Sequence, residues 1–313
     1  MRRPYGTPTI IWNLLSPRQD LFYTALSRFR AQQALGARPR KFRFRNKLLS
    51  LDSTIISLCL NLFPWALCRN KGGAKAHVLL DHDDYLPRYV LLTPARVPDV
   101  RVAHALALPK GSIVTMDRGY VDFRLFARWT ETGVFFVTRP LHHMVFEVVT
   151  SRPVPQNTNL RSDQTIRFTS EWAQRHGFKL LLRRIAVWNE ERQQEIVLLT
   201  NHFGFAASTL ANIYKQRWQI ELFFKALKRN LKIKTFVGTT ENALHIQIWT
   251  ALIAMLLLKW LHHLSQADWS LSNLATMLRL NLFTYRDLHD WLHSPFGTPP
   301  ILPATEQLQL ALL

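Results

Sequence analysis

Between Leu48 and Pro140, short apolar runs alternate with polar turns and a helical pattern, and this alternation limits the fold more than any other feature. Strands are short and end at turn residues, which fits the segments LLSLDSTIISL, AHVLL, YVLLT, SIVTM and VFFVT. The segment VDFRLFARWTETG instead has the pattern of a helix that stops at a glycine. Strands interleaved with helices in this order predict an α/β fold, with a sheet of mixed direction flanked by helices.

Outside that stretch the pattern changes. Residues 140–205 contain short strand-like pieces, MVFEVVTSR, LLLRRIAVW and EIVLLTN, and we interpret them as a β-rich insertion. Helical patterns follow over 214–236 and 241–264. We therefore expect a short basic N-terminal segment at 1–47, a core at 48–264 that contains the insertion, and a helical C-terminal region at 265–313.

The charge balance points to a polyanionic partner. The 313 residues include 40 Lys and Arg against 21 Asp and Glu, a formal net charge of +19. Such an excess repels itself and does not stabilise a fold, so it favours nucleic acid over an acidic membrane or a merely solvated basic surface. Hydrophobic residues make up 48% of the chain, which is enough for a core and argues against disorder throughout.

The sequence does not indicate secretion or membrane insertion. Cys59 and Cys68 are too few for a disulfide framework or a zinc site, and they fit a reducing cytosol. The N-terminus, MRRPYGTPTIIWNLL, lacks the apolar core of a signal peptide. The apolar stretch from Ile246 to Leu258 is shorter than the roughly 20 residues that span a bilayer. We expect a buried core helix there, no membrane partner and a cytoplasmic location.

Three carboxylates occupy positions from which they could share one site. Asp52 interrupts an apolar strand, Asp117 follows the run SIVTM, and Glu221 lies on the edge of an amphipathic helix. Carboxylates facing a phosphate chain suit Mg²⁺, and a pair of ions can activate the attacking oxygen and stabilise the leaving one. Structural roles stay open: a strand-end cap or ion pair for Asp52, a turn for Asp117, and helix salt bridges for Glu221. The denser cluster DHDDYLP reads as a hairpin turn.

The helical pattern over residues 214–236 carries one glutamate among seven Lys and Arg. Since a helix turns by roughly 100° per residue, one narrow stripe holds Tyr214, Arg217, Glu221 and Lys228. The neighbouring arc is apolar. Residues able to bind phosphate or metal thus lie where a helix borders a cleft.

A second basic pattern lies at residues 38–47, RPRKFRFRNK. Its period of two predicts a strand with Arg43 and Arg45 on one face and phenylalanine rings on the other. The segment reads equally well as a solvated edge strand and as a ribbon that follows DNA phosphates.

The spaced set Tyr214-x-x-Arg217-x-x-x-Glu221-x-x-x-x-x-x-Lys228 resembles the YREK signature of the insertion sequence 4 family of DDE transposases. SLDSTIISL resembles the family segment that holds the first catalytic aspartate, and MDRGYVD the segment that holds the second. GTTENALHIQIW is similar to the helix that follows the signature. The resemblance extends over roughly residues 40 to 264, with the segments in the family's order.

The resemblance implies a ribonuclease-H-like mixed sheet flanked by helices, with a β-rich insertion between the second aspartate and the glutamate. It also implies that Asp52, Asp117 and Glu221 are catalytic and bind two Mg²⁺ ions, which Mn²⁺ can replace. Water would cut the phosphodiester at the element's end, and the freed 3′-hydroxyl would attack target DNA, in some relatives after a hairpin forms. The implied partners are double-stranded DNA and a second copy of the chain, at the bacterial nucleoid.

By the same resemblance, Tyr214, Arg217 and Lys228 would hold phosphates of the DNA end. Arg217 offers a planar fork and Lys228 a point charge. We add to the expected DNA contacts Lys225, Lys232, Arg43, Arg45 and Trp188. Trp188 could hold a flipped base, although a tryptophan at that position also fits the core. Lys75 and His77 could face the same cleft, or His77 could be structural.

The N-terminal part departs from the family. Members carry a sizeable helical domain before the first aspartate, used to recognise element ends, whereas residues 1–51 precede Asp52 here. Truncation, a misassigned start, or a reduced role for the basic 38–47 tract would each account for this. The leading interpretation is a cut-and-paste DNA transposase. The alternatives are a truncated, catalytically incompetent protein that occupies transposon ends, and a Mg²⁺-dependent nuclease without strand transfer.

Overall fold

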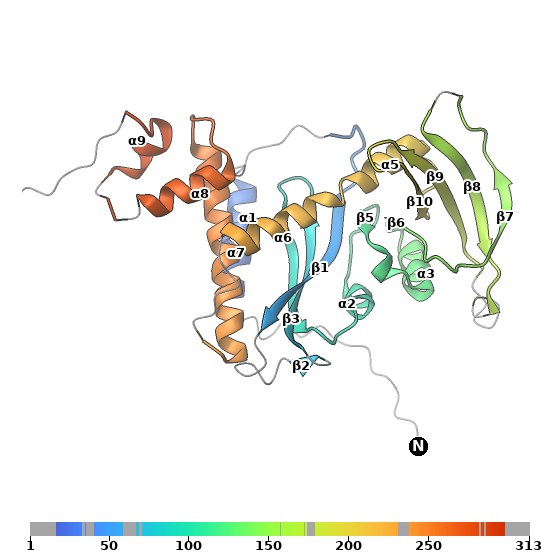
Figure 1. The fold of residues 1–313 in the computed structure, drawn as a ribbon, viewed down its shortest axis with the longest axis horizontal. Helices are drawn as coiled ribbons and strands as arrows, with labels where there is room; N and C mark the ends of the chain where they lie inside the picture. The colour runs from blue at the N-terminus through green and yellow to red at the C-terminus, as the bar shows by residue number, and fades with distance from the viewer. Residues whose placement is uncertain are drawn as a thin grey trace, which may run out of the picture. The chain divides into compact units, whose positions relative to one another are not determined.

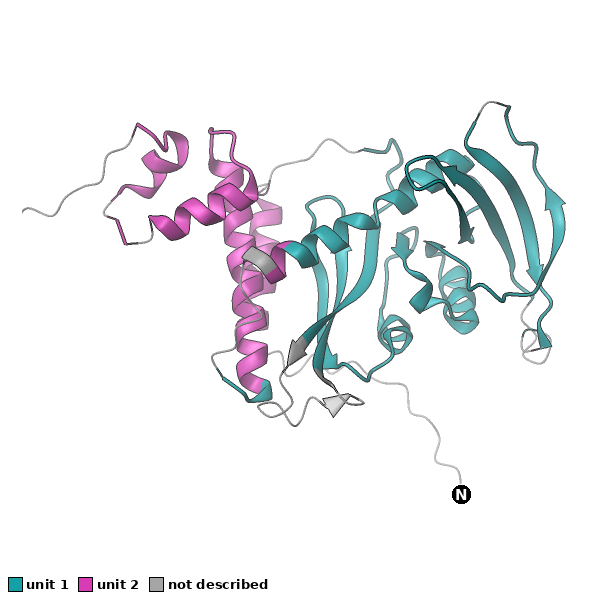
Figure 2. Cartoon of the chain, in the orientation of Figure 1, with its two compact units in different colours: residues 1–14, 38–225, 238–241 teal, residues 15–37, 226–237, 242–313 magenta. Residues whose placement is uncertain are grey.

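The computed structural model describes residues 17–32, 35, 41–58, 67–68, 71–156, 158–171, 173, 179–230, 238–281, 283–284 and 286–297. The chain divides into two units (Figure 2). Unit 1 consists of residues 1–14, 38–225 and 238–241, and unit 2 of residues 15–37, 226–237 and 242–313.

The described strands of unit 1 form one mixed sheet (Figure 1). They are β1 (Leu48–Leu58), β2 (Leu67–Cys68), β3 (Lys71–Asp81), β4 (Leu86–Pro94), β5 (Ile113–Met116), β6 (Phe135–Thr138), β7 (Phe146–Ser151), β8 (Leu160–Phe168), β9 (Leu181–Asn189) and β10 (Gln194–Thr200). Their order is β2-β3-β1-β5-β6-β10-β9-β8-β7, and β4, which is outside this path, pairs with β3. The β1–β5 and β5–β6 pairs are parallel and the others antiparallel. The expected mixed α/β fold is therefore confirmed.

Helices cover both faces of this sheet. Successive side chains along a strand point to opposite faces, and apolar side chains on each face pack against helices. Leu49 and Leu51 of β1 pack into a core with α2 (Asp99–Ala105) and α3 (Phe123–Glu131). Leu48 belongs to a second core, formed with α5 (Ala207–Lys215). The helix α3 ends as the sequence predicts, since Gly133 has a positive φ of 70°.

The basic 38–47 segment does not form the expected strand over its described residues, 41–47. The side chains nevertheless alternate: Arg43 and Arg45 are exposed, and Phe42 and Phe44 are partly buried. The two rings stack on each other, with centroids 5.0 Å apart, and Phe44 stacks on Phe205 at 5.0 Å. The segment is therefore fixed by ring packing, in place of a strand ladder.

The predicted helix over 214–236 is wrong as a single helix. The structure has α5, which ends at Lys215, a turn at 216–217, and α6 (Trp218–Asn230). In the turn, the N–H of Arg217 donates to the carbonyl of Tyr214 and the N–H of Ile220 to that of Arg217. These bonds span three residues instead of four, so the chain is wound more tightly there and the helix is interrupted.

Unit 2 contains α1 (Pro17–Ala31), α7 (Glu241–Leu264), α8 (Leu271–Leu280) and α9 (Leu288–His293). By length and composition alone, α7 could cross a membrane, so its apolar part is longer than expected. It packs against α1: the ring centroids of Trp249 and Phe22 are 5.7 Å apart, and Trp260 stacks on Phe29 at 5.5 Å. Trp291 is buried in a further cluster of this unit.

A buried ion pair joins the β7–β10 part of the sheet to the start of α5. The guanidinium of Arg183 donates to both carboxylate oxygens of Asp163, at 2.8 and 2.6 Å. It also donates to the carbonyl of Phe205 at 2.6 Å. Burial alone would raise the pKa of Asp163, but the hydrogen bonds and charge of Arg183 outweigh it and lower that pKa. The pair fixes the segment that leads into α5.

We predict that Asp163→Asn lowers the free energy of unfolding by about 3–5 kcal/mol, because it leaves the Arg183 charge buried without a counter-charge. The matched control is Glu147→Gln, which breaks the exposed Arg167–Glu147 pair on the same sheet and should cost less than about 1 kcal/mol. Urea unfolding of both variants measures this. Equal losses would contradict the prediction.

Candidate active site

The parallel pairing of β1 with β5 brings two aspartates together. Leu51 pairs with Met116, so Asp52 and Asp117 are the next residues on neighbouring strands. The Asp52 carboxylate accepts the N–H of Ser53 at 2.8 Å. The Asp117 carboxylate caps a 3₁₀ turn, η3 (Arg118–Tyr120), where it accepts the N–H of Gly119 at 2.9 Å. Each side chain is thus oriented by its own local backbone.

Arg217 links this pair to the third carboxylate. One terminal nitrogen of its guanidinium lies 3.3 Å from Asp52 Oδ2, and the other donates to Glu221 Oε1 at 2.6 Å. The Arg217 and Asp52 side chains are each only 17% exposed. The ring of Tyr214 lies against the same guanidinium, with its centroid 5.9 Å from Cζ. Three of the four residues on the predicted stripe therefore meet, although the helix is broken.

The site disfavours uncompensated negative charge. Burial raises the pKa of Asp52 to about 7, and the charges of Asp117 and Glu221 add to the rise, while the Ser53 N–H and Arg217 oppose it. Burial is also the main cause of the raised pKa of Asp117. Burial would lower the pKa of Arg217, but the hydrogen bond to Glu221 together with the charges of Tyr214, Asp52 and Glu221 outweighs that effect and raises it. Protonation of a carboxyl or a nearby positive charge would each relieve this repulsion.

The donor set fits a hard divalent cation, because Asp52, Asp117 and Glu221 offer only carboxylate oxygens. Their carboxylate oxygens do not all lie within 4.8 Å of one another. Among the described residues, the group of side chains that meets this distance is Asp287, His289 and Asp290. In this arrangement the Arg217 guanidinium contacts two of the three carboxylates and supplies the positive charge.

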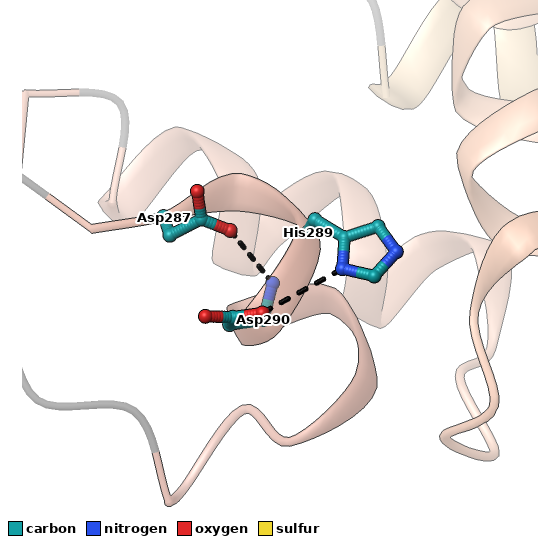
Figure 3. A group of neighbouring side chains, drawn as sticks. All are labelled: Asp287, His289 and Asp290. Atoms are coloured by element: carbon teal, nitrogen blue, oxygen red, sulfur yellow. Dashed lines mark hydrogen bonds and ion pairs between the residues drawn. The ribbon is translucent and has the colours of Figure 1, made fainter.

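The group in α9 is exposed and its geometry is that of a helix start (Figure 3). Asp287 caps the helix by accepting the N–H of Asp290 at 2.9 Å. His289 Nδ1 lies 3.6 Å from Asp290 Oδ1. The cluster is explained by capping of α9, and we assign no metal to it.

The other expected DNA contacts belong to different segments of the chain. Lys225 is exposed on α6, and Lys228 is partly buried on the same helix within unit 2. Lys232 lies outside the described residues, as does Cys59. Trp188 is partly buried on β9, and the guanidinium of Arg161 lies 5.6 Å from its ring centroid.

The sequence analysis missed Asp99, whose carboxylate is contacted by side chains from two neighbouring strands, β1 and β3. Ser53 Oγ and Lys75 Nζ donate to Asp99 Oδ1 at 2.9 and 3.0 Å, and His77 Nδ1 lies 3.4 Å from it. Burial lowers the pKa of His77 to about 4, so this imidazole is neutral. In sequence Asp99 signals only a helix start after Pro98, because Ser53, its hydrogen-bonding partner, lies 46 residues away. Lys75 and His77 thus contact Asp99.

Comparison with known families decides the class of protein. Residues 43–257 match the family model described as "Transposase DDE domain". The chain belongs to the transposase DDE domain family. Members of this family act on DNA and depend on a divalent metal.

Individual relatives agree with the family. The chain is 32% identical to "Putative transposase y4zB" of Sinorhizobium fredii, over 78% of this chain and 69% of the relative. It is 28% identical to "Probable transposase for insertion sequence element IS5377" of Geobacillus stearothermophilus, over 82% and 69%. It is 27% identical to "Putative transposase for insertion sequence element IS4SA" of a Synechocystis strain, over 69% and 60%.

The raised pKa of Asp52 gives a pH dependence of stability. Folding favours the protonated acid, so its contribution is complete below the unfolded pKa of 3.8 and is lost as pH rises through about 7. We predict that, without divalent metal, wild type loses about 1–3 kcal/mol of stability between pH 5 and pH 8 relative to Asp52→Asn. Urea unfolding at both pH values tests this. Parallel changes in the two proteins would contradict it.

Proposed function

We propose that this transposase moves an insertion sequence by cut-and-paste: it hydrolyses the phosphodiester at each element end and joins the freed 3′-hydroxyl to target DNA. The proposal rests on the placement of Asp52, Asp117, Arg217 and Glu221 beside the parallel β1–β5 pair, in a chain with net charge +19. The relatives described as transposases for insertion sequence elements support the same substrate class.

In this proposal Asp52, Asp117 and Glu221 hold two Mg²⁺ ions, with Mn²⁺ as a substitute. The bound cations supply charge stabilisation and lower the pKa of a coordinated water. The raised pKa values of Asp52 and Asp117 support the assignment, because buried carboxylates ionise readily only beside a positive charge. The carboxylates orient the cations, and their burial limits water around the reacting phosphate.

Arg217 and Tyr214 then hold the phosphate chain. A guanidinium presents parallel N–H groups that match two phosphate oxygens, and the Tyr214 ring lies against it and limits its rotation. With Asp52 and Glu221 holding cations, the Arg217 guanidinium would be available to bind a phosphate of the DNA end. Holding the scissile bond in line supplies a large part of the rate in such displacements.

Further DNA contacts are proposed on other parts of the chain. We propose Lys225, Lys228 and Lys232 for the phosphate backbone beyond the cleavage point, and Arg43 and Arg45 for a second stretch. Trp188 is proposed to hold a displaced base, supported by its partly buried ring and the neighbouring Arg161.

Two copies of the chain are proposed to act together, because two element ends must be joined in one event. Within each copy, we assign catalysis to residues 48–264 and binding of the DNA end to the β-rich strands at about 140–205. Residues 265–313 form a helical accessory region in this proposal. The proposed place of action is the nucleoid, where the DNA substrate lies.

The test uses DNA that carries the flanks of the gene, incubated with purified protein and Mg²⁺ or Mn²⁺. We predict metal-dependent cuts at the element ends by wild type and none above background by Glu221→Gln, because the variant loses a metal ligand while its DNA affinity remains. The matched control is Glu191→Gln, an exposed glutamate paired with Lys215, which should cut like wild type.

The outcomes separate the candidate functions. DNA binding without metal-dependent cutting by any of the three proteins would overturn the proposal in favour of a protein that only occupies element ends. Cutting without joining of the 3′-end would indicate a nuclease. Equal cutting by wild type and Glu221→Gln would overturn the metal assignment.

Arg217 gives a second prediction about the same site. Since its guanidinium contacts Asp52 and Glu221, it competes electrostatically with a cation. Arg217→Gln should therefore bind Mn²⁺ more tightly, by about tenfold for a gain of roughly 1.4 kcal/mol, yet bind the DNA end more weakly. Calorimetric titration without DNA measures the first effect. The control Lys215→Gln removes an exposed charge and should change neither the Mn²⁺ affinity nor the affinity for the DNA end. Weaker Mn²⁺ binding by Arg217→Gln would contradict the proposed competition.

A further inference from the structure

We infer that Asp99 is a positioning residue for the first metal-binding carboxylate, acting through Ser53 on Asp52. The inference rests on the proposed function of Asp52 as a metal ligand. It assigns a role to an acidic residue that lies outside the spaced signature and outside both aspartate segments.

Ser53 connects the two carboxylates through two different groups. Its backbone N–H donates to Asp52 Oδ1 at 2.8 Å, and its hydroxyl donates to Asp99 Oδ1 at 2.9 Å. The first bond fixes the carboxylate of Asp52 relative to the strand. The second fixes the strand itself at that residue, since it ties Ser53 to the first turn of α2.

Asp99 is itself firmly held. Lys75 Nζ donates to Asp99 Oδ1 at 3.0 Å and to the carbonyl of Val97 at 3.0 Å, so one ammonium group joins both sides of the α2 start. The Lys75 side chain is only 12% exposed. His77 is fully buried, and its Nδ1 lies 3.4 Å from the same carboxylate oxygen. A partly buried carboxylate with these contacts makes a rigid anchor.

The network reaches Asp52 from the opposite face of the sheet. In the β1–β3 register Ser53 pairs with His77, and Ile55 with Lys75, so these side chains share one face of the sheet. Asp52, one residue away, points to the other face. Asp99 therefore acts on Asp52 through the Ser53 backbone, and its own carboxylate is not a ligand in this arrangement.

Partners that orient a metal ligand generally change metal affinity by about 10–100-fold when removed. A merely structural ion pair changes folding stability and leaves metal affinity unaltered. The two roles are thus separated by measuring both quantities on variants of Ser53 and Asp99.

The experiment measures Mn²⁺ binding by calorimetry on the full chain without DNA, together with thermal unfolding. Ser53→Ala keeps the N–H bond to Asp52 and removes the hydroxyl link to Asp99; we expect Mn²⁺ affinity to fall about tenfold. Asp99→Asn should act in the same direction. The matched control is Ser50→Ala, the same change on the same strand, which removes hydrogen bonds to His82 and Thr115. Its Mn²⁺ affinity should equal that of wild type.

Asp52→Asn distinguishes the possible failures. If Asp52→Asn loses Mn²⁺ binding while Ser53→Ala binds like wild type, the metal site stands and the positioning role is overturned. If Ser53→Ala and Ser50→Ala lose affinity equally, the effect is one of strand stability and the positioning role is again overturned. If Asp52→Asn binds Mn²⁺ like wild type, the metal assignment fails and this inference fails with it.

Discussion

The parallel pairing of β1 with β5 is the constraint on which the candidate site depends. It pairs Leu51 with Met116, the residues directly before Asp52 and Asp117, so the spacing of the sheet brings the two aspartates close to each other. Leu49, Leu51 and Met116 bury the opposite sides of these strands in one core. The positions of the two aspartates are therefore fixed by the packing of the core, as expected for functional groups carried by regular secondary structure.

The helical side of the site depends on a different interaction. Arg183 holds the carbonyl of Phe205 and the carboxylate of Asp163, which fixes the chain just before α5. From there α5 leads to Tyr214 and then to Arg217, whose guanidinium contacts Asp52 and Glu221. Two arginines thus act in series: one anchors the helix to the sheet, and the other joins it to the strand-borne carboxylate.

The strands and the two aspartates could be predicted because the signals are local: Asp52 interrupts an apolar run, and Asp117 ends one before a turn. The single helix over 214–236 was predicted wrongly. The hydrophobic periodicity of a sequence does not reveal a turn such as that at 216–217, where each hydrogen bond links residues three positions apart. The strand at 41–45 was predicted wrongly for another reason: Phe44 stacks on Phe205, which lies far away in the sequence. Asp99 escaped notice because its partners become neighbours only in the folded sheet.

The joint between α5 and α6 limits how this chain can change length. Glu221 reaches Arg217 across one helical turn, and Arg217 reaches Tyr214 across the joint. One residue added after Gln216 would rotate everything beyond it by roughly 100° and carry Glu221 away from β1. The connection between β7 and β8 has no such dependence. Insertions and deletions among relatives should accordingly gather in the β-rich strands and avoid the ten-residue stretch from 212 to 221.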